Sequence, residues 1–249
     1  MRIVSLCPSL TELVFDLGLG ADLVAITKYC IYPADGVAAI ETVGGTKDPD
    51  VERIVALAPD VVLVNEEENR REDAEALEAA GLCLANSFPK TARDTAAMVR
   101  DYGRVLEVPE RAEAIATDIE ARTTAVEQRA AARGATRSFL YLIWRKPWMA
   151  CGTDTFPSAL LEQAGGQNAL AGDQRRFPDL DAAAIAALDP DLVLLSSEPF
   201  PFEAKHAEEL AEATGLPVER FRLVDGEDLS WHGSRTPRGV DYAEEALWD

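Results

Sequence analysis

Apolar and polar positions along the chain alternate between two spacings, which together predict a succession of buried strands and amphipathic helices. In the first half, short apolar runs predict strands at residues 2–6, 23–26, 61–64 and 82–85. Apolar residues at helical spacing predict one helix that begins at Ser9 and three more at residues 50–57, 70–80 and 92–106. Ser9 with Glu12 three residues later predicts a capping box at the first helix.

The second half of the chain begins the same alternation again. Strands are predicted at residues 138–143, 192–195 and 218–223, and helices at residues 156–164, 182–188, 204–213 and 237–247. Strands that alternate with helices form parallel sheets covered by helices. In such sheets a ligand binds beyond the carboxyl ends of the strands, so the loops after the strands are the candidate site.

One helix–strand unit occurs twice, at residues 54–63 and 185–194, with a constant offset of 131 residues. Ile54 corresponds to Ile185, and Pro59-Asp60 corresponds to Pro190-Asp191. Each copy is the apolar end of a helix, a Pro-Asp break and an apolar run suited to a buried strand. The repeat predicts two similar α/β lobes, and a cleft between two lobes is a common place for a ligand.

Between the two halves, residues 109–132 contain no Gly or Pro after Pro109 and are rich in Ala, Glu and Arg. Roughly 24 helical residues span about 36 Å, which suits a strut that links two lobes, although an ordinary surface helix is the alternative. We therefore predict an N-terminal α/β lobe at residues 1–106, a linking helix at 107–134 and a C-terminal α/β lobe at 135–249.

Aromatic and basic residues gather in the loops predicted to follow strands. Three of the four tryptophans, Trp144, Trp148 and Trp231, lie there, either as flat surfaces for a large planar ligand or as caps on the core. The basic residues of these loops suit a ligand with carboxylates or phosphates. They are Lys28, Lys47, Arg145, Lys146, Arg175, Arg176 and Arg235.

The charge balance of 24 basic against 44 acidic residues argues against nucleic acid as a partner, because phosphate binding requires a basic face. It also argues against anionic membrane surfaces. No stretch is apolar over the ~18–20 residues of a membrane helix, so we expect no membrane insertion. The first residues lack the apolar core of a signal peptide, which leaves a cytoplasmic protein or one whose leader has been removed.

Candidate metal and catalytic residues are few. His232 is the better metal candidate of two histidines, although a lone histidine is more often a hydrogen-bonding residue. The cysteines Cys7, Cys30 and Cys151 fall near loops, whereas Cys83 is predicted to be a small core residue. No nucleophile elbow, P-loop or dinucleotide fingerprint occurs.

Several blocks of sequence resemble the helical-backbone (class III) substrate-binding proteins of ABC importers for vitamin B12, haem and iron–siderophore complexes. The likeness covers nearly all of the chain. The blocks are Pro8-Ser9-Leu10-Thr11-Glu12, Glu52-Arg53-Ile54-Val55-Ala56-Leu57-Ala58-Pro59-Asp60 and Phe156–Asn168 with Gly165-Gly166. The resemblance implies two Rossmann-like lobes with parallel sheets, one long rigid helix between them, and a ligand held in the cleft between the lobes.

The resemblance also implies residue roles. Tyr29 matches a tyrosine in the cleft of the vitamin B12 carriers, while Thr46, Asn65 and Phe177 stand where that carrier has tryptophans. The expected ligand is a corrinoid or related metal chelate, with no intrinsic cofactor. The candidate ligand-binding residues are Tyr29, Cys30, Thr46, Lys47, Asn65, Trp144, Arg145, Trp148, Arg176, Phe177, Trp231, His232 and Arg235.

The family docks on its permease through one acidic residue in each lobe. Glu67 and Glu198 are related by the repeat offset and are the expected pair, with Glu66, Glu68 and Glu203 as near alternatives. We therefore expect a monomeric, non-enzymatic, extracytoplasmic (periplasmic) binding protein that serves an ABC permease. The alternative is a cytoplasmic enzyme or metallochaperone for tetrapyrroles on the same scaffold, which the missing leader favours and the missing catalytic constellation opposes.

Overall fold

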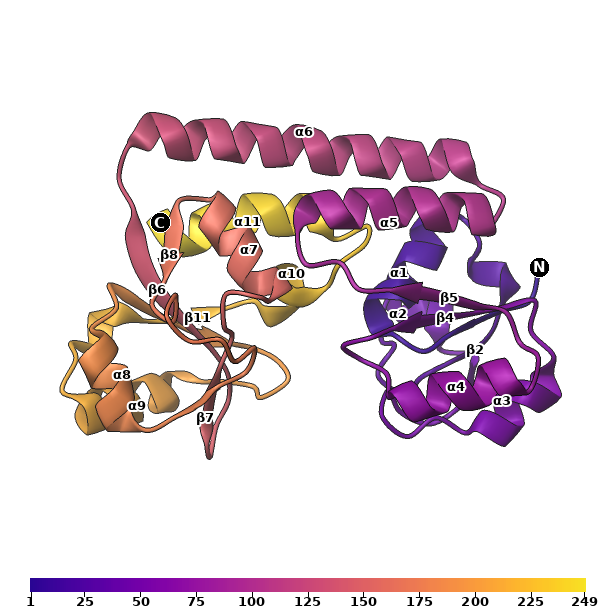
Figure 1. Ribbon diagram of the computed structural model, residues 1–249, viewed down its shortest axis with the longest axis horizontal. Coiled ribbons are helices and arrows are strands. Elements are labelled where there is room, and N and C mark those ends of the chain that lie inside the picture. The colour runs from indigo at the N-terminus through magenta and orange to yellow at the C-terminus, as the bar shows by residue number, and fades with distance from the viewer. The chain divides into compact units, whose positions relative to one another are not determined.

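Two β-sheets with surrounding helices form the framework of the computed structural model, which describes residues 1–249 (Figure 1). Contacts divide the chain into two compact units. The first unit comprises Met1–Pro89, Asp94–Asp118 and His232–Arg235. The second comprises Lys90–Arg93, Ile119–Trp231 and Thr236–Asp249. The lobe boundaries expected at residues 106 and 134 stay a prediction.

The sheet of the first unit has five parallel strands in the order β3-β2-β1-β4-β5. These strands are β1 (Ile3–Ser5), β2 (Leu23–Ile26), β3 (Glu41–Thr42), β4 (Val61–Asn65) and β5 (Leu84–Ser87). Its helices are α1 (Pro8–Asp16), the 3₁₀ turn η1 (Gly20–Asp22), α2 (Ala34–Val37), α3 (Val51–Leu57), α4 (Arg71–Ala79) and most of α5 (Ala92–Val105). The predicted alternation of strands and helices is confirmed here, and β3 and α2 are additions to it.

The sheet of the second unit is mostly parallel and has the order β11-β10-β6-β7-β9, with β8 also paired to β6. Its strands are β6 (Arg137–Trp144), β7 (Trp148–Ala150), β8 (Gly166–Asn168), β9 (Asp179–Leu180), β10 (Leu192–Ser196) and β11 (Phe221–Val224). Its helical elements are α7 (Phe156–Gln163), α8 (Ala182–Leu188), α9 (Ala204–Thr214), η2 (Val218–Arg220), α10 (Gly226–Ser230) and α11 (Thr236–Trp248).

Two predictions for the second unit need correction. Strand β7 pairs antiparallel with β6, so Trp148 lies in a strand of a hairpin and not in a loop. The strand predicted at residues 218–223 begins with a 3₁₀ turn, because Pro217 starts η2 and β11 begins only at Phe221.

The sequence repeat is reproduced in atomic detail within each unit. Asp50 caps α3 by accepting from the Arg53 N–H, and Asp181, 131 residues later, caps α8 by accepting from the Ala184 N–H. Further along, the Asp60 carboxylate accepts from the Arg2 N–H just before β1, at 2.6 Å. The Asp191 carboxylate accepts from the Ser138 N–H in β6, at 2.8 Å. The aspartate of each Pro-Asp break therefore fastens the repeated strand to its neighbour in the sheet.

Both helices of the repeat also end in the same way. The closing residues Ala58 and Asp189 have φ of 45° and 44°, in the left-handed region. This conformation reverses the chain direction so that the following strand can enter the sheet.

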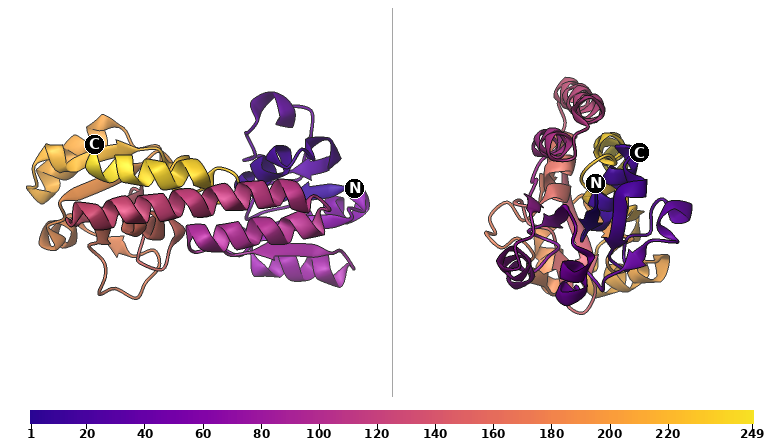
Figure 2. Two further views of the ribbon diagram at one scale, coloured as in Figure 1. Left: turned by 90° about the horizontal axis from the view of Figure 1, so that it is seen from above. Right: turned by 90° about the vertical axis from the view of Figure 1, so that its right-hand side faces the viewer.

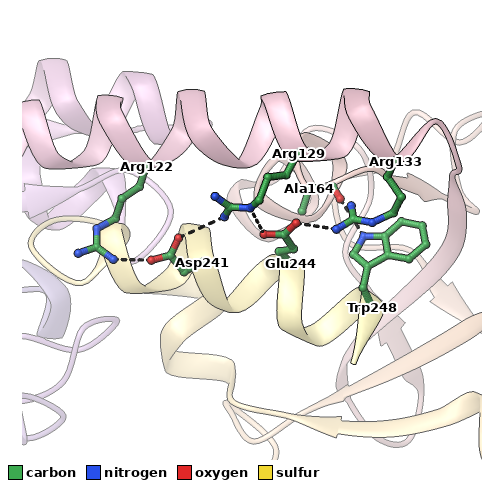
Figure 3. Close-up of polar contacts among 7 residues, drawn as sticks. All are labelled: Arg122, Arg129, Arg133, Ala164, Asp241, Glu244 and Trp248. Carbon is green, nitrogen blue, oxygen red and sulfur yellow. Dashed lines mark hydrogen bonds and ion pairs between the residues drawn. The ribbon is translucent and has the colours of Figure 1, made fainter.

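The long helix α6 (Pro109–Arg133) confirms the predicted link between the two units, since its residues up to Asp118 belong to the first and those from Ile119 to the second. In the second unit α11 lies beside it (Figures 1 and 2). Figure 3 shows the contacts. Glu244 accepts from Arg129 at 2.7 Å and from Arg133 at 2.6 Å, and Asp241 pairs with Arg122.

The start of α1 departs from the expected capping box. Cys7 occupies the cap position without a side-chain cap bond, because Pro8 begins the helix. Ser9 Oγ instead lies 3.3 Å from Cys7 Sγ, and Glu12 is engaged elsewhere, as described below. Cys83, predicted to be in the core, is exposed because β5 begins one residue later. No helix combines the length and the apolar character needed to cross a membrane.

Candidate functional site

In the first unit, the loops after β2 and β3 present exposed groups at the carboxyl edge of the sheet. Tyr29 is 53% exposed, and Lys28 Nζ lies 5.2 Å from the centre of its ring. The exposed Lys47 donates from Nζ to the Glu67 carbonyl at 2.5 Å, which ties it to the loop after β4. Tyr29 is therefore an accessible aromatic face, as expected of a ligand contact.

Three other predicted contacts of the first unit are buried. The Cys30 thiol is bonded to the hydroxyls of Thr11 at 3.0 Å and Thr27 at 3.2 Å. Burial raises the pKa of this thiol, so it stays protonated at neutral pH. Thr46 is 8% exposed, and its carbonyl accepts from Asn69. These two side chains shape the loops and expose little surface to a ligand.

Asn65, the last residue of β4, is 2% exposed and organises the loop that follows. Its Oδ1 accepts from the Glu67 N–H at 2.9 Å and the Glu68 N–H at 3.1 Å. Its Nδ2 donates to the Ser87 carbonyl at 3.1 Å. Burial raises the pKa of the nearby Glu68 carboxyl, and the charge of Lys47 acts in the opposite direction. Asn65 therefore sets the position of the acidic loop.

His232 belongs to the first unit, and its Nε2 lies 3.3 Å from Asn65 Nδ2. Because Asn65 Oδ1 already accepts two N–H groups, Nδ2 is the donor and Nε2 accepts, which places the ring proton on Nδ1. The side chain is 8% exposed, and burial lowers the pKa of His232 to about 4. No group of three or more His, Cys, Asp or Glu residues able to hold a metal ion occurs in the structure, so nothing joins His232 as a ligand set.

Arg235 follows in the same short stretch and is fully engaged within the first unit. Its guanidinium forms a two-pronged ion pair with Glu12 of α1 at 2.9 and 2.7 Å, and it lies 4.8 Å from the centre of the Tyr32 ring. This pairing anchors the stretch from His232 to Arg235 to α1.

In the second unit an aromatic cluster surrounds the β6–β7 hairpin. Trp144 is 41% exposed and meets the edge of Phe200 with ring centres 6.0 Å apart. Phe200 packs on Phe202, and Trp148 stacks on Phe202 at 6.2 Å. Trp148 also packs against the buried core of this unit. Trp144 thus forms the exposed part of the cluster, while Trp148 connects the cluster to the buried core of this unit.

His206 is 6% exposed and packs on this cluster as well. Its Nδ1 accepts from the Glu203 N–H at 2.9 Å and so caps α9.

The arginines predicted to face a ligand in the second unit already have acidic partners. Arg145 pairs with Glu209 of α9 through three contacts of 2.7–3.0 Å and lies 5.7 Å from the centre of the Trp148 ring. Arg176 donates to the Asp154 carbonyl at 2.8 Å and lies over Phe177, which is 37% exposed. Both guanidinium groups therefore stiffen the loops around the exposed aromatic rings.

Glu198, in the loop after β10, holds the side chains of Ser230, the last residue of α10, and of Trp231, the next residue. Its Oε1 accepts from Ser230 Oγ at 2.7 Å and from Trp231 Nε1 at 2.8 Å. Trp231 is only 8% exposed, so it lacks the open face expected of a stacking surface. The backbone of Glu198 is bonded to Ser196 Oγ, which corresponds by the repeat to the bonds of Asn65 with Glu67.

Sequence reasoning missed Phe200, Glu12 and Asn69 as parts of these arrangements. Alternation of proline and phenylalanine at residues 199–202 is a local signal for Phe200. Glu12 and Asn69 carry no such signal, because their partners are 223 and 63 residues away in the chain.

Comparison with known proteins places these features in context. The sequence profile of the family described as periplasmic binding protein matches residues 3–215. The chain is 25% identical over 240 residues to a vitamin B12-binding protein of Vibrio parahaemolyticus, covering 96% of this chain and 86% of that protein. It is 29% identical over 199 residues to a vitamin B12-binding protein of Photorhabdus laumondii, covering 79% and 70% of the two chains.

Solved structures share the fold. The periplasmic vitamin B12 binding protein BtuF of Vibrio cholerae superposes with a TM-score of 0.84 at 22% identity, covering 99% of this chain and 96% of that one. The periplasmic haem-binding protein RhuT of Roseiflexus sp. RS-1 also has a TM-score of 0.84, at 25% identity and 98% coverage of both chains.

Proposed function

The chain belongs to the periplasmic binding protein family, and we propose that it binds a large flat metal chelate, a corrinoid or a haem, in the periplasm and delivers it to an ABC importer. Members of this family bind ligands and are not enzymes, which sets aside the tetrapyrrole enzyme. The observation that carries the proposal is an exposed aromatic side chain at the carboxyl edge of each sheet, Tyr29 in one unit and Trp144 in the other.

An exposed aromatic ring at the ligand-binding edge of a sheet offers a flat apolar face with a polar tip to a ligand. Tyr29 lies in the loop after β2, and Trp144 is the last residue of β6. Ligands of such sheets bind at the carboxyl ends of the strands. Each aromatic contact with a planar ligand contributes about 0.5–1.5 kcal/mol beyond the area that it buries. An exposed ring of this kind offers a macrocycle a larger contact face than it offers a small polar solute.

The charges of the loops favour a ligand whose periphery is largely neutral. Arg145 is occupied by Glu209 and Arg235 by Glu12, so binding carboxylates would require these pairs to open. A corrin ring carrying amides avoids this cost, which supports the corrinoid over haem. Tyr29 supports haem instead, because a tyrosine oxygen is a known ligand of haem iron.

Docking on the permease is proposed for Glu67 and Glu198, which stand at equivalent places after the repeated strands β4 and β10. Both are half-buried, and the loops that carry them are held by hydrogen bonds from Asn65 and Ser196. Carboxylates at fixed positions suit pairing with the guanidinium groups of a partner.

The proposal is tested by titrating the purified protein with cyanocobalamin, cobinamide and haemin, followed by visible absorbance and calorimetry. We expect Trp144→Ala to weaken binding of the true ligand by about 1–2 kcal/mol, or roughly 5- to 30-fold. The matched control Val218→Ala removes an apolar side chain that is 45% exposed at the other end of a strand, and it should change the affinity less than twofold.

Tyr29→Phe separates the two ligand classes. It keeps the ring and removes the oxygen, so corrinoid affinity should change little, whereas haem bound through the phenol oxygen would lose its iron–tyrosine absorbance band. A protein that binds none of the three probes would contradict the proposed function.

A further inference from the structure

The side chain of Asn69 joins three of the loops at the carboxyl edge of the first unit's sheet. Asn69 lies in the loop after β4 and is 7% exposed. Its Nδ2 donates to the Leu6 carbonyl, just after β1, at 2.9 Å and to the Thr46 carbonyl, in the loop after β3, at 3.0 Å. Its Oδ1 accepts from the N–H of Asn65, the last residue of β4, at 2.8 Å. One carboxamide therefore holds the ends of three strands together.

These bonds require both the donors and the acceptor of an asparagine side chain. The two N–H groups of the amide face carbonyl oxygens, so its oxygen faces the Asn65 N–H and the orientation of the amide is fixed. An aspartate of the same size would place a carboxylate against two carbonyl oxygens. An apolar side chain would leave these buried groups without partners, which costs more than a typical hydrogen bond contributes. The loop that contains Thr46 therefore depends on Asn69.

The loop that Asn69 holds lies directly against Tyr29. A Cβ atom placed on Gly45, the residue before Thr46, would lie 3.1 Å from Tyr29 Cε2 and 3.2 Å from Lys28 Cε. The tyrosine ring and the lysine stem therefore contact the bare backbone of Gly45. Because Gly45 is joined directly to Thr46, the bond from Asn69 to the Thr46 carbonyl also sets the position of the surface on which the Tyr29 ring packs.

The corresponding residue of the second unit also supports an exposed aromatic ring. At the repeat offset of 131 residues, Asn69 corresponds to Phe200. Phe200 meets the Trp144 ring edge to face, with ring centres 6.0 Å apart. Within each unit, the residue at this position therefore supports the exposed aromatic residue of that unit, through hydrogen bonds to a loop in the first and by direct packing in the second.

We propose that Asn69 is a positioning residue for ligand binding: through the Thr46 carbonyl it holds Gly45 against Tyr29 and so fixes the aromatic face that the first unit offers to the ligand. This inference rests on the proposed function. Asn69 is itself almost completely buried, so its effect on affinity passes through the ring of Tyr29.

The positioning is tested first without any ligand. The chain has five tyrosines, so their ring signals can be followed by NMR in a tyrosine-labelled sample, and Tyr29→Phe identifies the one of interest. Asn69→Ala should shift this signal because it releases the loop. Gly45→Ala, which keeps every bond of Asn69, should shift it because the new methyl group presses on the ring. A Tyr29 signal unchanged in Asn69→Ala would overturn the inference.

Asn168→Ala is the matched control. Asn168 is 1% exposed, belongs to the second unit and also makes three hydrogen bonds through its carboxamide. Its loss should destabilise the protein to a similar degree and leave the Tyr29 signal where it is in the wild type. A Tyr29 signal that shifts equally in Asn69→Ala and Asn168→Ala would reduce the role of Asn69 to general stability and overturn the inference.

The effect on binding is tested by a double-mutant cycle with whichever probe binds, among cyanocobalamin, cobinamide and haemin. Tyr29→Ala should weaken binding roughly 5- to 30-fold, and Asn69→Ala roughly three- to tenfold, because a displaced ring keeps part of its contact. In the Tyr29→Ala background, Asn69→Ala should weaken binding less than about twofold, since the ring that it positions is gone. Any effect of Asn168→Ala should be the same in both backgrounds.

A second substitution guards against a variant that fails to fold. Asn69→Asp keeps the acceptor for the Asn65 N–H and loses both donors, so it should weaken binding as Asn69→Ala does, and urea unfolding shows which variants are folded. Wild-type affinity in a folded Asn69 variant, or equal weakening with and without the Tyr29 ring, would overturn the positioning role while leaving the proposed function intact. A wild type that binds none of the probes would instead overturn the proposed function, and the binding role of Asn69 with it.

Discussion

His232 makes the stability of the protein depend on pH in a direction that can be stated in advance. Its ring is buried and accepts a hydrogen bond from Asn65 through Nε2, which only the neutral form can do. Burial lowers the pKa of His232 from its ordinary value of 6.5 to about 4 in the folded protein. As the pH falls below 6.5, His232 therefore binds a proton in the unfolded chain, whereas in the folded protein it stays neutral until the pH approaches 4.

The sign and size follow from this difference. The contribution of His232 is fully present above pH 6.5 and is lost as the pH falls toward 4. Each pH unit between these limits costs at most about 1.36 kcal/mol, so the full loss is about 3 kcal/mol, and roughly 2.5 kcal/mol is lost between pH 7.5 and 4.5.

Two measurements check the prediction. Because the chain has only two histidines, the His232 ring signals can be followed by NMR from pH 7.5 to 4 and identified with His232→Gln. In urea unfolding, the wild type should lose about 2.5 kcal/mol more than His232→Gln between pH 7.5 and 4.5, since Gln keeps an acceptor for Asn65 and does not titrate. A ring that titrates near 6.5, or parallel losses in both proteins, would refute the reasoning.

Two further predictions concern the framework. Glu244→Ala should destabilise the protein by about 1–2 kcal/mol, because the 16%-exposed carboxylate pairs with two arginines of α6, whereas Asp241→Ala at a 36%-exposed carboxylate should cost about 0.5 kcal/mol. Urea unfolding in low and high salt checks this, and equal losses would contradict it. Ala58→Gly should raise the thermal midpoint and stabilise the protein by about 0.5–1 kcal/mol, because Ala58 has a positive φ, and Asp189→Gly should gain less, because it also removes the exposed ion pair of Asp189 with Arg220. A lower midpoint in both variants would contradict the common helix ending.

The fold could be predicted from the sequence because its signals are local. The spacing of apolar residues gave the strands and helices, and the repeated Pro-Asp break gave the two units, with Asp60 and Asp191 in matching roles. The hairpin at Trp148 was missed because a strand of three residues that pairs antiparallel has no periodicity to recognise.

The candidate site was predicted less completely, because exposure and pairing depend on residues far apart in the chain. Tyr29 has the exposed face that its loop position suggested, and Trp144 is exposed although it is the last residue of β6 and not part of a loop. Nothing local in the sequence indicates that Trp231 is buried against Glu198 or that Arg235 is paired with Glu12, 223 residues earlier. Residue type and loop position identify which side chains can bind, and long-range pairing decides which of them are available.

The membership of His232–Arg235 in the first unit has a consequence for any attempt to divide this protein. The unit draws its residues from both ends of the gene, and a single cut within α6 would strip Glu12 and Asn65 of their partners. A fragment ending at Asp118 would therefore lack His232–Arg235, which belong to its own unit. An intact first unit therefore requires a chain that also contains the second unit.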